Sequence, residues 1–192
     1  MKPATLPNIF KIMHRVSRRT EPYHSAFLAA MLEWSHAGDR RLFDAFWRRA
    51  APDAWEIPGG DVTVLAEDVL GTRGRVDLAL LVGTRRVLGV EVKTREASTT
   101  DGQLQRYRDG LMAKYPGLDL AIAYLTPFDR IRAGDAATTL RSVIEFDKFA
   151  ASFPQSRHLS WLDLVDIEWD GGGRVGPARR VCENGNLVRA EP

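Results

Sequence analysis

Between residues 62 and 93 the apolar residues change from the spacing typical of a helix to the spacing typical of a strand. Alternate positions carry apolar side chains in one part of this segment: Val76, Leu78, Leu80 and Val82. A period of two places such side chains on one face of an extended strand. Glycine-containing segments at 71–74 and 83–86 separate three strands of this kind. The pattern therefore predicts a three-stranded antiparallel meander.

Helical periodicity surrounds this meander. Residues 20–34 and 40–50 before it, and 100–115 and 138–153 after it, repeat apolar side chains three and four positions apart. Between the last two helices, residues 118–126 form an apolar run close to prolines, which suits a buried strand. Because a strand that follows a helix indicates layered packing, we predict an α/β fold with a central mixed sheet of four or five strands flanked by helices.

The chain has room for one domain with small appendages. It is 192 residues long, against a usual domain size of roughly 100 to 200 residues. We expect a main domain at 20–169, preceded by a basic N-terminal helix at 1–19 and followed by a C-terminal tail or peripheral hairpin at 170–192. Within the main domain, residues 158–169 are apolar and fit either a strand or a helix.

Composition excludes several classes of protein. Hydrophobic residues make up 44% and charged residues 27% of the chain, which argues against a disordered, collagen-like or disulfide-rich sequence. Cys182 is the one cysteine and cannot form an internal disulfide, so we expect a cytoplasmic protein. No apolar run in the sequence approaches the roughly 18 residues that a membrane helix needs, so no membrane partner is expected. The net charge of +2 does not by itself predict a polyanion as partner.

Two acidic residues and a lysine in the meander carry the strongest chemical signal. Glu91 and Lys93 are two residues apart in the third strand, so their side chains point to the same face. A turn centred on residue 84 places Asp77, in the second strand, directly opposite Glu91 on that face. The sequence therefore predicts two carboxylates and an ammonium group side by side.

Such a pair of carboxylates needs compensation. Like charges directly opposite each other in a sheet are unfavourable unless a proton or a cation lies between them, and Lys93 offsets only part of the repulsion. A divalent metal accounts for the rest, since Mg²⁺ is commonly bound by one or two carboxylates together with waters and a substrate phosphate. The alternative is that Asp77, Glu91 and Lys93 are ordinary solvent-facing residues of an amphipathic hairpin.

The predicted helix after the meander adds Gln103 and Tyr107, four residues apart on one face. With Asp77 and the segment 91–93 they resemble the PD-(D/E)XK nuclease superfamily, although Val76 stands where the literal motif has proline. A narrower resemblance, to standalone bacterial and phage-associated PD-(D/E)XK nuclease-like proteins, covers about residues 20 to 126. Its further motifs are Glu21-x-x-His24-Ser25-x-Phe27-Leu28, His36-x-Gly38-Asp39, the Arg75-Val-Asp77 strand, Gln103-Leu104-x-Arg106-Tyr107 and Tyr124-Leu125-Thr126-Pro127.

The resemblance implies a restriction-endonuclease-like core and Mg²⁺-dependent hydrolysis of DNA phosphodiester bonds, with Mn²⁺ as a substitute for Mg²⁺. Asp77, Glu91 and the backbone carbonyl of Val92 would hold the metal. In this superfamily a glutamate on the first core helix often joins the metal site. Glu21 is the candidate by its position in the motif, and Glu33 is the second candidate.

Other residues would act on the substrate. Lys93 would orient the attacking water or stabilise the developing charge, and Gln103 and Tyr107 would position the phosphate backbone. By the same resemblance, the products would carry a 5′-phosphate and a 3′-hydroxyl. We expect a structural role for His24 beside the site. Glu67, in the first strand, fits a third metal ligand, a residue that supports the ligands, or an ordinary exposed strand residue.

Two other functional classes stay open. A nuclease-like fold could bind nucleic acid or a partner protein without cutting, although the intact acidic pair and lysine count against this. A different metal-dependent phosphodiesterase could act on RNA or a nucleotide, but the sequence has no evident stripe of base-stacking aromatic residues. No helix-turn-helix or zinc-finger pattern supplies base readout, so we expect structure-directed or weakly specific action on DNA, or specificity from a partner protein. A homodimer also stays open.

Overall fold

The computed structural model describes residues 21–93, 101–126, 141–165, 181–183 and 186–188. Its main sheet has five strands: β1 (Val62–Val69), β2 (Arg75–Val82), β3 (Arg86–Val92), β4 (Asp119–Thr126) and β5 (Ser156–Ser160). They lie in the order β1-β2-β3-β4-β5. The β1–β2 and β2–β3 pairs are antiparallel, whereas the β3–β4 and β4–β5 pairs are parallel. The predicted meander and the mixed sheet are therefore confirmed.

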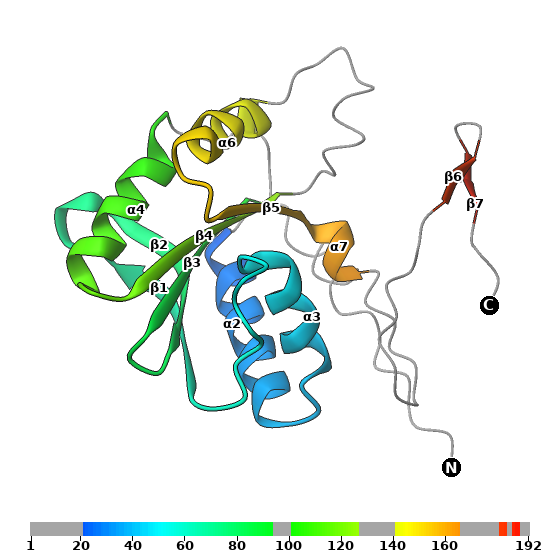
Figure 1. The fold of residues 1–192 in the computed structure, drawn as a ribbon, viewed down its shortest axis with the longest axis horizontal. Helices are drawn as coiled ribbons and strands as arrows, with labels where there is room; N and C mark the ends of the chain where they lie inside the picture. Colours follow the sequence, from blue (N-terminus) through cyan, green and yellow to red (C-terminus); the bar gives the residue numbers. More distant parts are fainter. Residues whose placement is uncertain (1–20, 94–100, 127–140, 166–180, 184–185, 189–192) are drawn as a thin grey trace.

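Helices cover both faces of this sheet. They are α2 (Glu21–Ala37), α3 (Arg41–Ala50), α4 (Gln103–Lys114), α6 (Arg141–Ser152) and the short α7 (Trp161–Val165), with a single 3-10 turn η1 at Gly71–Arg73. Figure 1 shows α2 and α3 on one side of the sheet and α4 and α6 on the other. The predicted α/β class is confirmed by this layering, and the predicted N-terminal helix at 1–19 lies outside the described residues.

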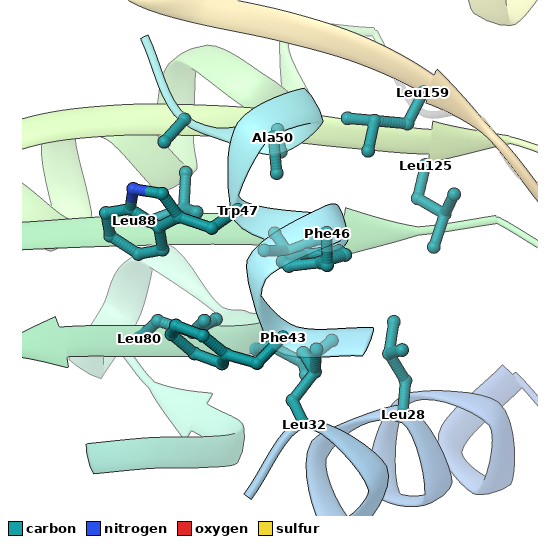
Figure 2. Close-up of a cluster of buried hydrophobic side chains, with 14 of the residues drawn as sticks. Leu28, Leu32, Phe43, Phe46, Trp47, Ala50, Leu80, Leu88, Leu125 and Leu159 are labelled. Carbon is teal, nitrogen blue, oxygen red and sulfur yellow. The ribbon is translucent and has the colours of Figure 1, made fainter. Parts of the chain in front are cut away.

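The larger of two hydrophobic cores lies between the sheet and the α2–α3 pair. Apolar residues of α3 recur three and four positions apart, so one side of the helix is apolar and faces the sheet. Figure 2 shows this face packed against α2 and the strands. The largest side chains of the cluster are fully buried: Leu28, Leu32, Leu42, Phe43, Phe46, Trp47, Leu80 and Leu88.

A second core lies on the opposite face, beneath α4 and α6. Leu104 and Leu111 of α4 pack with Phe146 and Phe149 of α6 against strand residues that include Ile122. Because both faces of the sheet are covered, β3 and β4 read as nearly continuous apolar runs. A buried acidic side chain on either strand is therefore an exception that needs its own explanation.

The register of the β2–β3 hairpin is the one predicted from the turn. Leu78 pairs with Val90, and Val82 pairs with Arg86, so the turn is centred on residue 84. The apolar alternation of both strands specifies this register, because a slip by one residue would turn every core side chain to the other face.

The ambiguous segment 158–169 contains both structures that its sequence allowed. Its first residues end β5, and α7 then begins at Trp161. Ser160 marks the change, since its hydroxyl accepts a hydrogen bond from Asp163 N at 3.3 Å and its own N–H donates to Asp163 Oδ2 at 2.7 Å. This reciprocal pair is a capping box, which starts a helix directly after the strand.

In the C-terminal region, where a tail or a peripheral hairpin is predicted, the structure describes two short strands. Strand β6 (Val181–Glu183) pairs antiparallel with β7 (Asn186–Val188). Across the described residues, no helix combines the length and the apolar character needed to cross a membrane.

Candidate active site

Strands β2 and β3 part immediately beyond their last backbone pair, and the predicted acidic residues lie at that point. The ladder ends at Leu78 and Val90, so Asp77 and Glu91 are the next opposed residues of the same register. Asp77 Oδ2 accepts a hydrogen bond from the backbone N–H of Val92 at 2.7 Å. The Asp77 carboxylate thus replaces a backbone carbonyl at the fork, which fixes its position between the strands.

Glu91 is held from two directions. Its side chain is 2% exposed, and Oε1 lies 2.5 Å from Lys93 Nζ. The same oxygen accepts a hydrogen bond from Gln103 Nε2 at 2.8 Å, and Gln103 Nε2 also donates to Tyr107 Oη at 2.6 Å. The fold therefore brings together Glu91, Lys93, Gln103 and Tyr107, which the sequence placed on β3 and on the following helix.

Lys93 is fixed through its backbone as well as its ammonium group. Its side chain is 4% exposed. Its N–H donates to Leu125 O of β4 at 2.7 Å, and its C=O accepts a hydrogen bond from Trp161 Nε1 of α7 at 3.0 Å. The contact between Trp161 and Lys93 was not predicted, because nothing in the sequence links a tryptophan to a strand residue 68 positions earlier.

The two carboxyl groups hold their protons more tightly than usual. Burial raises the pKa of Asp77 to about 6, although the Val92 hydrogen bond and the charge of Lys93 oppose the rise. Burial and then the charge of Asp77 raise the pKa of Glu91 to about 8. With one proton shared between them and Lys93 charged, the buried group is electrically neutral. A proton thus provides compensation when no other cation does.

Tyr107 keeps its hydroxyl proton at ordinary pH. Burial, followed by the charge of Glu91, raises the pKa of this phenol above its usual range. Because Tyr107 Oη accepts the hydrogen bond from Gln103, the phenolic proton remains available for donation to another group.

The donors at the fork suit a hard divalent cation. Glu91 Oε2 is buried and accepts no hydrogen bond within the described part of the chain. The carbonyl of Val92 points to the same side as its N–H, which bonds Asp77. Carboxylate and carbonyl oxygens are ligands that Mg²⁺ accepts, with waters and phosphate completing the set. In the described ranges no three His, Cys, Asp or Glu side chains are grouped to hold a metal, so carbonyl, water and substrate oxygens would have to contribute.

Glu67 lies opposite Asp77 across the β1–β2 pair. The neighbouring pairs Ala66–Leu78 and Asp68–Val76 define this position, while Glu67 itself has a left-handed backbone with φ 55°. Ser25 Oγ donates to Glu67 Oε1 at 3.3 Å, and Arg75 Nε forms a salt bridge with Glu67 Oε2. The charge of Glu67 raises the pKa of Asp77, so a third carboxylate belongs to the surroundings of the site.

The remaining candidates lie on α2. Glu21 is the first residue of this helix and shares a face with Ser25, four residues later, but its side chain lies outside what the structure describes. Glu33 is exposed and follows Ser25 by eight residues, about 12 Å along the helix axis. Position on the helix therefore favours Glu21 over Glu33. His24 is buried, with its ring centroid 6.1 Å from that of Trp161.

Comparisons of the chain with protein-family models, with curated proteins and with solved structures found no match. The geometry and chemistry of the fork between β2 and β3 are therefore the basis on which a function can be assigned.

Proposed function

We propose that the protein is a Mg²⁺-dependent deoxyribonuclease that hydrolyses DNA phosphodiester bonds at the fork between β2 and β3. The main support for the proposal is the environment of the Glu91 carboxylate. This carboxylate is buried, has one oxygen that accepts no hydrogen bond from any described residue, and lies beside a second carboxylate whose pKa is also raised. Carboxyl groups with such raised pKa values cluster at functional sites, and a bound cation would replace the proton that the pair otherwise holds.

Asp77, Glu91 and the carbonyl of Val92 would hold the ion. A divalent cation there would lower the pKa of a bound water and neutralise charge on the scissile phosphate. To bind it, Asp77 and Glu91 release the proton that they share. Glu21 would add a fourth ligand from the start of α2, and Mn²⁺ would substitute for Mg²⁺.

Lys93 supplies a fixed positive charge beside these ligands. Its ammonium group is paired with Glu91 Oε1 at 2.5 Å and its backbone is hydrogen-bonded on both sides, so the charge can stabilise a developing phosphate charge from a fixed position. Gln103 uses its amide on Glu91 and Tyr107, which gives it the role of positioning both. The hydroxyl proton of Tyr107 is then directed at a phosphate oxygen.

The proposal includes the finer fold and the compartment expected from the sequence. A mixed sheet with a β2–β3 hairpin carrying Asp77 and the segment 91–93 supports a restriction-endonuclease-like core. The single cysteine, Cys182, supports a role in the reducing cytoplasm.

Plasmid nicking tests the proposal. Supercoiled DNA is incubated with the protein in Mg²⁺ and in EDTA, and the wild type is compared with Asp77→Ala and Lys93→Ala. We expect cleavage only with the metal, and a loss of about 10² to 10³ in rate for Lys93→Ala, the size found when one charge-stabilising donor is removed. Arg48→Ala, on the exposed side of α3, is the matched control and should cut normally.

Metal binding separates the two variants. In a Mn²⁺ titration by calorimetry, Asp77→Ala should lose binding, while Lys93→Ala should retain it. Equal nicking by wild type and Asp77→Ala would identify a contaminating nuclease and contradict the proposal. So would failure of the wild type to cut any DNA in Mg²⁺ or Mn²⁺.

A further inference from the structure

Glu67 interrupts the alternation of β1. Val64 belongs to the core beneath α2 and α3, so a regular strand would turn Asp68, four residues later, to the same face. Instead Asp68 is bonded by Lys114, the last residue of α4, and by Tyr115 directly after it, on the opposite face. The left-handed backbone at Glu67 produces this change and directs the Glu67 carboxylate to Ser25 of α2 and to Arg75.

A glutamate is an unusual residue for this conformation. Glycine and asparagine adopt a positive φ with little strain, whereas a residue with a long side chain does so at a cost in free energy. Such strain is found where the surrounding structure holds a residue for its function. Glycine would serve the backbone at position 67 better, so we attribute the presence of glutamate there to a role of its carboxylate.

The carboxylate of Glu67 pairs electrostatically with one edge of the Arg75 guanidinium, although its Oε2 accepts no hydrogen bond among the described residues. Only Nε of Arg75 takes part in the salt bridge, and the side chain is 54% exposed. Within the described residues neither terminal nitrogen of Arg75 has a hydrogen-bond partner. The result is an arginine that is oriented at its inner edge and open at its outer edge, which is the part that binds phosphate in a bidentate manner.

Arg75 also lies at a suitable distance from the fork. It precedes Asp77 by two residues in β2, a separation of about 6.6 Å along the strand. Neighbouring phosphates of a nucleic-acid strand are separated by a similar distance. A phosphate beside the one at Asp77 and Glu91 would thus reach the guanidinium.

We propose that Arg75, oriented by Glu67, binds the phosphate next to the scissile one, so that the substrate strand runs along β2 away from the fork. This inference rests on the proposed nuclease function, because it takes its substrate from there. Arg75 is the binding residue, and Glu67 is a positioning residue that acts through it.

Binding without cleavage tests the inference separately from catalysis. The affinity of the full chain for a fluorescent 20-base-pair DNA duplex is measured by anisotropy in EDTA at several salt concentrations. Arg75→Ala should weaken binding about tenfold and lower the slope of log affinity against log salt by about 1, as expected for one lost phosphate contact. Arg75→Lys should recover part of the affinity, and Arg48→Ala should change neither quantity.

Glu67→Gly distinguishes positioning from a structural role. Glycine tolerates the positive φ, so the variant should melt at or above the temperature of the wild type. It should nevertheless bind DNA several-fold more weakly. In this background Arg75→Lys should no longer lower the affinity for DNA. A variant that melts lower but binds DNA as the wild type does would show that Glu67 is structural and would overturn its positioning role.

The possible failures are distinct. Arg75-dependent binding of DNA in a protein that never cuts would support this inference and contradict only the nuclease proposal. Metal-dependent cutting together with unchanged affinity and salt slope in Arg75→Ala would overturn this inference alone.

Discussion

At the scale of single residues, Glu91 shows how strongly the surrounding protein can raise the pKa of a carboxyl group. Its carboxyl group is buried against Asp77, and its pKa rises from the usual 4.5 to about 8. The folded protein therefore holds a proton that the unfolded chain releases above about pH 4.5. This contribution to stability is complete below pH 4.5 and is lost as the pH rises towards about 8.

The first prediction concerns Glu91→Gln in the absence of metal. Glutamine keeps the shape of the side chain but carries no charge, so the variant should become more stable than the wild type, by about 1 to 3 kcal/mol, as the pH rises from 5 to 9. Urea unfolding in EDTA at several pH values measures this difference. A difference in stability that does not change with pH would contradict the raised pKa.

The residue scale also shows what the sequence could and could not predict about the site. Asp77, Glu91 and Lys93 were identified because strand alternation and the turn place them together. The left-handed backbone of Glu67 leaves no mark in the sequence, since glutamate is not a residue that favours a positive φ. Arg75 belongs to the Arg75-Val-Asp77 motif of the sequence, but its pairing with Glu67 could be seen only in the structure.

At the scale of elements, strands and their register were predicted correctly where the apolar periodicity extended over enough residues to fit a single arrangement. The β2–β3 register was confirmed because apolar residues at alternate positions permit no slip. The segment 158–169 remained ambiguous because strand β5 has five residues and α7 has five, too few for either period to be recognised.

The packing of α4 on η1 gives the second prediction. A Cβ atom at Gly110 would lie 2.8 Å from Leu70 Cβ and 3.3 Å from Arg73 Cβ. Alanine has a higher helix propensity than glycine, by about 1 kcal/mol, but overpacking of this kind typically costs about 1 to 3 kcal/mol.

We therefore expect Gly110→Ala to destabilise the protein by about 1 kcal/mol, because the contact outweighs the propensity. Chemical unfolding measures the change, and Ala113→Gly, on the exposed side of the same helix, reports the propensity difference alone. A gain in stability for Gly110→Ala would show that η1 does not pack so closely on α4.

At the scale of the whole molecule, the third prediction links metal binding to global stability. A cation that binds only the folded state stabilises it, by about 2.7 kcal/mol at a concentration 100 times the dissociation constant. Because Asp77 and Glu91 must release a proton to bind it, Mn²⁺ should raise the melting temperature more at pH 8.5 than at pH 5.5.

Differential scanning fluorimetry with and without Mn²⁺ measures these shifts. Asp77→Ala should show no shift at either pH, while Arg48→Ala should behave as the wild type. Equal shifts at both pH values in the wild type would indicate binding away from the carboxylate pair.

The order of the strands in the sheet, which equals their order along the chain, has a consequence for protein synthesis. Each strand that leaves the ribosome finds its neighbour already made, and α2 and α3 precede them all, so the nascent chain can build its sheet without waiting for distant partners. The hydrogen bond from Trp161 to the carbonyl of Lys93 is an exception, because it joins residues 68 positions apart. The lysine beside the acidic pair is consequently secured late in translation, after the rest of the meander has formed.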